Sequence, residues 1–229
     1  MKERIFSYDN CRFFVPPTRG GQESGGEGWA RITAKGRREY LPGIDPARSA
    51  LIVVDLCRGC VEEWPKMIAR YDGKLAALFV ERMQNVTVPN VERLLALFRD
   101  KGMPVIYLTM GPNPIISRIA PREGELVLSK FSSGAYATSA LDNVLREYDV
   151  ATTFFTGTDT CGCVAATMTA AYDKGSQTIL VEDACCSSRP DTHAAAVTIW
   201  QYKGFVRSTD QVIADYPWQS WVDPALRDG

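Results

Sequence analysis

Apolar residues gather in short runs that alternate with longer amphipathic segments between about residues 50 and 215. The run 49–55, SALIVVD, is apolar up to its last residue, which is typical of a strand buried on both faces. Further strands are predicted for 104–109, 125–130, 151–155, 177–183 and 205–207. Helices are predicted for 89–101, 138–148, the segment from Cys163 to Gly175, 191–203 and 210–213. This alternation predicts an α/β fold, a doubly wound, mostly parallel sheet of about six strands with helices on both faces.

The two ends of the chain lack this pattern. Residues 1–48 contain the glycine-rich, polar stretch PPTRGGQESGGEGWA and are predicted to form an irregular arm. Residues 217–229 are predicted to form an irregular tail, in which Trp218 and Trp221 dock on a partner or on the body of the protein. One α/β domain is therefore expected over 49–216, a natural size for a single domain.

The charge and hydropathy of the chain limit the classes of partner that it is expected to bind. The 229 residues carry a formal net charge of −1, so no broad basic field is expected, and neither nucleic acid nor an anionic membrane is predicted as the main partner. No apolar run reaches the length of a membrane span, and the N-terminus lacks the apolar core of a signal peptide. A cytoplasmic protein that acts on a small molecule is the resulting expectation.

The seven cysteines are odd in number, which does not favour a disulfide framework in a reducing compartment. Cys57 and Cys60 have CxxC spacing, which suits a redox pair or half of a zinc site. The pairs 161/163 and 185/186 have the wrong spacing to complete such a site, so structural zinc is disfavoured.

Three chemically capable side chains each follow a predicted strand. Asp55 ends the first strand, Lys130 ends the third, and Cys163 comes after the fourth strand and a turn that contains Gly157 and Gly162. The carboxyl ends of parallel strands lie on one edge of a sheet, so the three side chains can converge. A cysteine at a helix N-terminus has a lowered pKa and is a candidate nucleophile, and desolvation would make Asp55 a usable base. The plainer alternatives are a small buried cysteine, a capping aspartate and a solvated lysine.

The residues around these three positions form blocks in a specific order. They are the strand ending in Asp55, residues 130–136 (KFSSGAY), and residues 157–164 (GTDTCGCV). Together, over about 49–215, they resemble the isochorismatase-like cysteine hydrolases, and the third block is most similar to the carbamoyl-cleaving members. The resemblance implies a Rossmann-like fold, a homodimer or homotetramer, and a hydrolase with no cofactor.

The resemblance also implies roles for individual residues. Asp55, Lys130 and Cys163 would form a catalytic triad, in which Asp55 takes the thiol proton and Cys163 attacks a carbonyl to form a thioester. The turn containing Thr158, Asp159, Gly162 and Cys163 would form the oxyanion hole, with a cis peptide bond between Thr158 and Asp159. Nicotinamidases in this family bind a metal through an Asp and two His, whereas the only histidine here is His193, so no metal is expected.

Four further residues are candidates for contact with a small polar substrate, although each is more readily explained as a bystander. They are Arg58, Asn113, Tyr136 and Arg189. His193 is interpreted as a structural helix residue, outside catalysis. Asp159 and Asp183 suit helix or turn caps.

Three functions remain in competition. The favoured one is a metal-independent cysteine amidohydrolase that cleaves a C–N bond of a small amide, ureide or N-carbamoyl compound and releases ammonia or an amine. The second is a vinyl-ether hydrolase of the isochorismatase type, which would use Asp55 and Lys130 and have no need of Cys163. The third is a non-catalytic binding or redox-sensing protein, with Cys57 and Cys60 as its switch.

Overall fold

The computed structural model describes residues 4–8, 11–15, 44–203, 205–218 and 221, in two compact units. The first unit comprises residues 1–42 and 222–229, and in it β1 (Arg4–Tyr8) pairs antiparallel with β2 (Cys11–Val15). The irregular arm predicted for 1–48 is wrong for these strands, whose aromatic and β-branched residues favour extended chain. Residues 16–43 of the predicted arm and 222–229 of the predicted tail lie outside the described residues.

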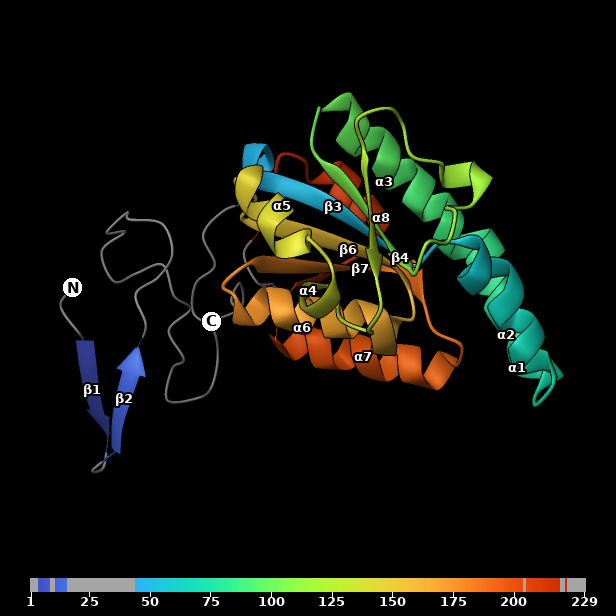
Figure 1. The fold of residues 1–229 in the computed structure, drawn as a ribbon, viewed down its shortest axis with the longest axis horizontal. Helices are drawn as coiled ribbons and strands as arrows, with labels where there is room; N and C mark the ends of the chain where they lie inside the picture. The colour runs from blue at the N-terminus through green and yellow to red at the C-terminus, as the bar shows by residue number, and fades with distance from the viewer. Residues whose placement is uncertain (1–3, 9–10, 16–43, 204, 219–220, 222–229) are drawn as a thin grey trace. The chain divides into compact units, whose positions relative to one another are not determined.

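The second unit, residues 43–221, is built on a six-stranded parallel sheet in the order β5-β4-β3-β6-β7-β8. This confirms the predicted α/β sheet, with β3 at its centre (Figure 1). The strands are β3 (Ser49–Val54), β4 (Val105–Met110), β5 (Leu126–Lys130), β6 (Thr152–Thr158), β7 (Gln177–Cys186) and β8 (Phe205–Arg207). All six residues of β3 are buried, as its unbroken apolar run predicts.

Helices cover both faces of this sheet (Figure 1). On one face lie α3 (Val88–Asp100) and α8 (Thr209–Ala214), and on the other α6 (Ala165–Asp173) and α7 (Pro190–Lys203). The remaining helices are α1 (Trp64–Ala69), α2 (Gly73–Arg82), α4 (Ala135–Thr138) and α5 (Leu141–Glu147). None of the described helices is long and apolar enough to cross a membrane.

Alternate side chains of each strand supply the two halves of the core. Phe155 joins the cluster that includes Met168 of α6 and Trp200 of α7. Phe154, its neighbour, faces the other side, where its ring lies 5.3 Å from that of Phe98 and 4.6 Å from that of Trp218. This is the period of two that a strand buried on both faces requires.

The start of the C-terminal tail belongs to this core. Trp218 is fully buried, and its indole Nε1–H donates to the carbonyl of Val212 at 2.7 Å. Trp221 is also buried, and its Nε1–H donates to Asp215 at 2.8 Å. Of the two docking places predicted for these tryptophans, the structure shows the body of the protein.

The helix predicted for 138–148 is confirmed over Leu141–Glu147 as α5, but its predicted start is wrong, because Thr138 belongs to a separate helix, α4. Ser139 is extended, with φ −135° and ψ 172°, and its hydroxyl donates to the carbonyl of Ala135 at 2.7 Å. The same hydroxyl accepts the N–H of Leu141 at 3.3 Å, so Ser139 ends one helix and begins the next.

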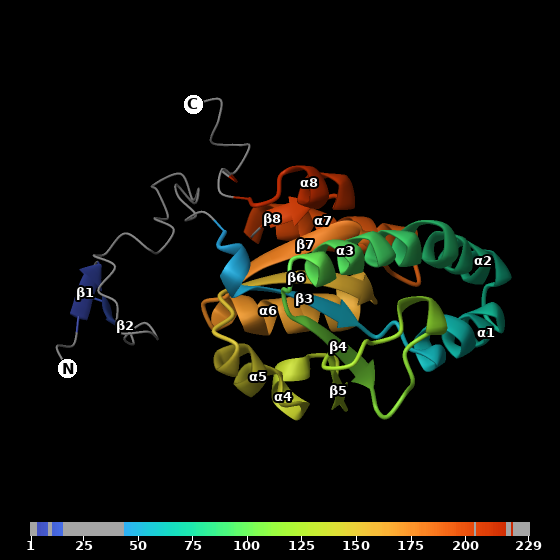
Figure 2. The ribbon, with the colours of Figure 1, turned by 90° about the horizontal axis from the view of Figure 1, so that it is seen from above.

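The parallel strands bring their carboxyl ends to one edge, where the arrowheads of β3, β4 and β6 lie together (Figure 2). Asp55 follows β3 directly and has φ 54°, an uncommon conformation that aspartate tolerates better than most residues. Next to it, β6 passes very close to β3 at Gly157. A Cβ on Gly157 would lie 2.0 Å from the carbonyl oxygen of Val54, and φ there is 111°. Glycine at 157 is therefore what allows β6 to approach β3 beside Asp55.

We expect Gly157→Ala to prevent folding or to reduce the free energy of unfolding by more than about 4 kcal/mol, because the clash is with backbone that cannot move aside. Gly175→Ala is the matched control, since φ is also positive (86°) but nothing lies within 4 Å of the added Cβ. It should cost only about 1 kcal/mol. Urea denaturation compares the two, and equal losses would contradict the close approach of β6 to β3.

Candidate active site

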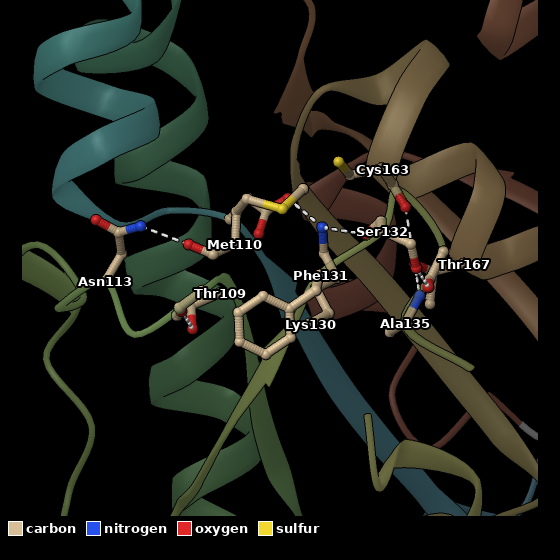
Figure 3. Close-up of polar contacts among 12 residues, drawn as sticks. Thr109, Met110, Asn113, Lys130, Phe131, Ser132, Ala135, Cys163 and Thr167 are labelled. Carbon is tan, nitrogen blue, oxygen red and sulfur yellow. Dashed lines mark hydrogen bonds and ion pairs between the residues drawn. The ribbon is translucent and has the colours of Figure 1, made fainter. Parts of the chain in front are cut away.

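A buried ion pair lies at the carboxyl edge of the sheet. Lys130, the last residue of β5, places Nζ 2.8 Å from Oδ2 of Asp55, and the two side chains are 0% and 3% exposed. Nζ also donates to the carbonyl of Ser132 at 3.2 Å (Figure 3). Burial lowers the pKa of Lys130, but the hydrogen bond and charge of Asp55 outweigh it, and the net direction is upward. Lys130 is therefore a firmly held cation.

Cys163 lies next to this pair, in the π-helical turn Thr160–Val164 that leads into α6. Two hydrogen bonds fix its backbone (Figure 3). The hydroxyl of Thr167 donates to the carbonyl of Cys163 at 2.7 Å, and the same hydroxyl accepts the N–H of Ala135 at 3.2 Å. The half-buried thiol lies close enough to Asp55 and Lys130 for both to shift its pKa. The structure thus brings the three residues of the predicted triad together.

The direction of the Cys163 pKa differs from the sequence-based expectation. Burial, followed by the charge of Asp55, raises the pKa of the thiol to about 11, and Lys130 offsets only part of this. The lowering expected from a helix N-terminus is therefore wrong here, because desolvation and a neighbouring carboxylate dominate. The thiol is protonated at neutral pH and needs a base. Asp55 Oδ1 is buried and makes no hydrogen bond within the described part of the chain, so it can receive that proton.

The turn before Cys163 is braced by Asp159. The Thr158–Asp159 peptide bond is cis, as the family resemblance implies. One oxygen of the Asp159 carboxylate accepts the N–H of Cys161 at 3.3 Å, and the other accepts both N–H and hydroxyl of Ser188 at 3.1 Å. Asp159 therefore acts as a cap, one of the roles that the sequence allows.

Gly162 does not offer a free donor at this turn. Its N–H donates to the carbonyl of Asp159 at 3.0 Å. Gly162 is predicted to form part of the oxyanion hole, but its N–H cannot also donate to a substrate oxygen there. Thr158 is the last residue of β6 and pairs with Cys186 of β7. Among the four residues predicted for the hole, this leaves the N–H groups of Asp159 and Cys163 as candidates.

The four residues predicted to contact substrate have other partners. Arg58 and Arg189 are exposed and pair with Glu62 at 3.2 Å and Asp191 at 2.7 Å. Asn113 donates its amide to the carbonyl of Met110, at the end of β4 (Figure 3). Tyr136 packs against the core, with Lys174 over its ring at 5.6 Å. Their predicted substrate contacts stay predictions.

Cys57 and Cys60 lie beside the triad as a thiol pair. The N–H of Cys60 donates to the carbonyl of Cys57 at 3.1 Å, which closes a tight turn directly after Leu56. A hydrogen bond from the Cys60 thiol lowers the pKa of Cys57 to about 7, and the same contact raises the pKa of Cys60, as do Asp55 and Cys163. The described residues contain no group of three or more His, Cys, Asp or Glu side chains arranged to hold a metal ion.

Sequence reasoning missed the role of Arg82, which reaches this region from α2. Its guanidinium donates to the carbonyls of Cys185 and Glu182 and contacts His193, which in turn contacts Thr160 in the Cys163 turn. Arg82 is about a hundred residues from its partners in the sequence, and no residue pattern near Arg82 indicates that it contacts them.

Comparison with known proteins agrees with this fold. Residues 49–211 match the Isochorismatase domain, and the chain therefore belongs to the isochorismatase family of hydrolases. Two curated relatives are amidohydrolases. Maleamate amidohydrolase of Pseudomonas putida is 26% identical over 163 residues, which cover 65% of this chain and 76% of the relative. N-carbamoylsarcosine amidase of an Arthrobacter species is 28% identical over 162 residues, which cover 55% of this chain and 60% of the relative.

A solved structure shares the fold. The cysteine hydrolase from Pseudomonas syringae pv. phaseolicola superimposes with a TM-score of 0.65 at 24% identity, covering 75% of this chain and 93% of the other. At that identity, the likeness establishes the fold alone.

Because Asp55 would be left buried and unpaired, we expect Lys130→Met to lower the free energy of unfolding by about 3–5 kcal/mol. Adding Asp55→Leu should recover most of this loss. The control is Lys66→Met, which breaks a pair with Glu63 whose side chains are 68% and 58% exposed. It should change stability by less than about 0.5 kcal/mol. Urea titrations measure all three, and similar losses for Lys130→Met and Lys66→Met would contradict the buried pair.

The Cys163 thiol should become more reactive when its neighbouring negative charge is removed. Asp55→Asn leaves Lys130 as the nearby charge, so the pKa of Cys163 should fall from about 11 and its thiolate fraction at pH 7 should rise. Alkylation by iodoacetamide, followed by mass spectrometry in a Cys161→Ser background, should therefore be faster than in the parent. Its pH profile should shift to lower pH. An unchanged or slower rate would contradict the claim that the charge of Asp55 raises the pKa of Cys163.

Proposed function

We propose that this chain is a cysteine amidohydrolase that cleaves a C–N bond of a small amide, ureide or N-carbamoyl compound through a thioester. The observation that carries the proposal is the Cys163 thiol beside the buried Asp55–Lys130 pair, with its pKa raised by burial and by Asp55. A thiol held protonated next to an unpartnered carboxylate oxygen is suited to transfer its proton at the moment of attack. Two relatives named as an amidohydrolase and an amidase support the same reaction class.

The first half of the reaction forms the thioester. Asp55 takes the proton from Cys163 while Sγ bonds to the carbonyl carbon, and the carbonyl electrons move to oxygen. The N–H groups of Asp159 and Cys163 donate to this oxyanion, as preorganised dipoles do in acyl transfer. The C–N bond then breaks, and Asp55 returns the proton to the departing nitrogen.

The second half regenerates the enzyme. Asp55, again unprotonated, takes a proton from water as the water oxygen attacks the thioester carbonyl. Collapse of this second intermediate breaks the C–S bond, and the sulfur recovers the proton through Asp55. Throughout, Lys130 stays charged and balances the negative charge that moves between Asp55, sulfur and the substrate oxygen. No metal is needed for any of these steps.

The nucleophile is tested by Cys163→Ala, assayed for ammonia release against a panel of amides, ureides and N-carbamoyl compounds in a buffer that contains EDTA. We expect activity to fall by at least about 1,000-fold, because no other group can form the thioester. Cys161→Ala, which removes an exposed thiol two residues away, should keep nearly full activity.

Each contrary outcome identifies another function. Full turnover of an amide by Cys163→Ala would refute the nucleophile. Hydrolysis of a vinyl ether by both the parent and Cys163→Ala would favour the isochorismatase-type reaction, which uses Asp55 and Lys130 alone. A reversible Cys57–Cys60 disulfide in a chain without any turnover would favour a redox sensor.

A further inference from the structure

Three side chains from distant parts of the sequence, the half-buried Arg82 and the buried His193 and Thr160, form a continuous chain behind the Cys163 turn. Nη2 of Arg82, at the end of α2, lies 2.9 Å from Nε2 of His193. Nδ1 of His193, in the first half of α7, lies 2.9 Å from Oγ1 of Thr160. His193 is 8% exposed and Thr160 is fully buried, so water does not compete for these contacts.

The direction of each hydrogen bond follows from the groups involved. A guanidinium can only donate, so Nε2 of His193 accepts from Arg82 and carries no proton. The neutral ring then has its proton on Nδ1, which donates to the Thr160 hydroxyl. Burial, followed by the charge of Arg82, lowers the pKa of His193 to about 4, so this neutral tautomer persists across the ordinary pH range. At neutral pH, His193 therefore connects Arg82 to Thr160 through fixed hydrogen bonds and does not carry a proton between them.

Thr160 is a sensitive point in the turn. It follows Asp159 and opens the π-helical turn that carries Cys163, so its position affects the N–H groups of both residues. The carbonyl of Thr160 also accepts the N–H of Ala165, where the turn passes into α6. Two contacts therefore fix the turn. Asp159 accepts a hydrogen bond from Ser188, and the Thr160 hydroxyl contacts His193 of α7, which in turn contacts Arg82 of α2.

We propose that His193, anchored by Arg82 and acting through the Thr160 hydroxyl, is a positioning residue that aims the N–H groups of Asp159 and Cys163 at the substrate oxyanion. The inference rests on the proposed cysteine hydrolase function. The proposal gives His193, the only histidine of the chain, a role in the reaction although His193 itself contacts no reacting atom. Small misplacements of such donors are costly, since their value depends on orientation.

Thr160→Val tests this link because it removes the hydroxyl and keeps the shape. Thr209→Val is the matched control: Thr209 is also fully buried, and its hydroxyl donates to Asp183 at 2.7 Å, at the start of α8. Both variants lose one buried hydrogen bond, so both should lose some stability. We expect kcat for the best amide substrate to fall about tenfold or more in Thr160→Val, with KM changed much less. Thr209→Val should keep its kcat.

A second readout does not depend on knowing the natural substrate. Propionaldehyde should add reversibly to Cys163: the S–C bond forms, the carbonyl electrons move to oxygen, and the thiol proton completes the hemithioacetal. Its oxygen occupies the place of the oxyanion, so its dissociation constant, measured as protection of Cys163 from iodoacetamide, should rise about tenfold in Thr160→Val. Alkylation without aldehyde needs no oxyanion donor and should stay within about twofold of the parent rate.

Substitutions of His193 complete the test. Glutamine keeps one acceptor for Arg82 and one donor for Thr160, so His193→Gln should retain most of kcat and of the aldehyde affinity. His193→Leu can make neither bond and should match Thr160→Val.

The outcomes separate the two claims. If the parent binds propionaldehyde and Thr160→Val binds it equally well, the positioning role is refuted and the nucleophile remains. Equal slowing of alkylation and turnover in Thr160→Val would also refute it, because the defect would then lie in the thiol itself. If the parent shows neither protection nor amide turnover, the proposed function fails, and the inference fails with it.

Discussion

The ion pair between Lys130 and Asp55 is the interaction on which the rest of the site depends. Two opposite charges are held 2.8 Å apart with almost no exposure to water, an arrangement that stabilises neither partner without the other. The pair fixes one oxygen of Asp55 and leaves the other without a hydrogen-bond partner among the described residues. In the proposed mechanism, that oxygen is the base for Cys163, and the charge of Lys130 offsets the negative charge that develops during attack.

The parallel sheet explains how three residues spread over more than a hundred positions come together. Each lies at or after the end of a strand whose carboxyl end is at the same edge of the sheet. The approach of β6 to β3 at Gly157 then brings the Cys163 turn to the side of Asp55. Contacts with residues outside the turn fix it in place. Asp159 accepts a hydrogen bond from Ser188, and the Thr160 hydroxyl contacts His193. The proposed base therefore follows a strand of the sheet, and the proposed oxyanion donors lie in a turn held by contacts outside the sheet.

Much of this was visible in the sequence, for physical reasons that are easy to state. Strands buried on both faces leave unbroken apolar runs, and a charged residue or a glycine turn at the end of such a run marks the ligand edge. Asp55, Lys130 and Cys163 were found in this way. The pKa direction of Cys163 was not, because position at a helix start suggests lowering, whereas the outcome depends on burial and on a carboxylate from another strand.

Other features depend on contacts that no local pattern encodes. Arg82 and His193 are 111 residues apart, and nothing near either residue indicates that they meet. Ser139 looked like a residue inside or before a single helix, yet its hydroxyl bonds both backward and forward and separates two helices. The thiol pair Cys57–Cys60 was visible as a motif, but its place beside Asp55 follows from the tight turn after β3. Long-range contacts such as that between Arg82 and His193, together with local side-chain bonds such as those of Ser139, set the limit of what the sequence predicts.

The central claim is that Cys163 carries the acyl group of the substrate during turnover. Its most direct test is to quench the enzyme with acid within milliseconds of mixing with its best amide or ureide substrate and to analyse the peptides by mass spectrometry. We expect an adduct on Cys163 with the mass of the acyl portion, which hydroxylamine removes as the hydroxamate from an amide substrate and as the N-hydroxyurea from a ureide. Turnover at full rate with no adduct at any time and no hydroxamate, or an adduct on a different residue, would contradict it.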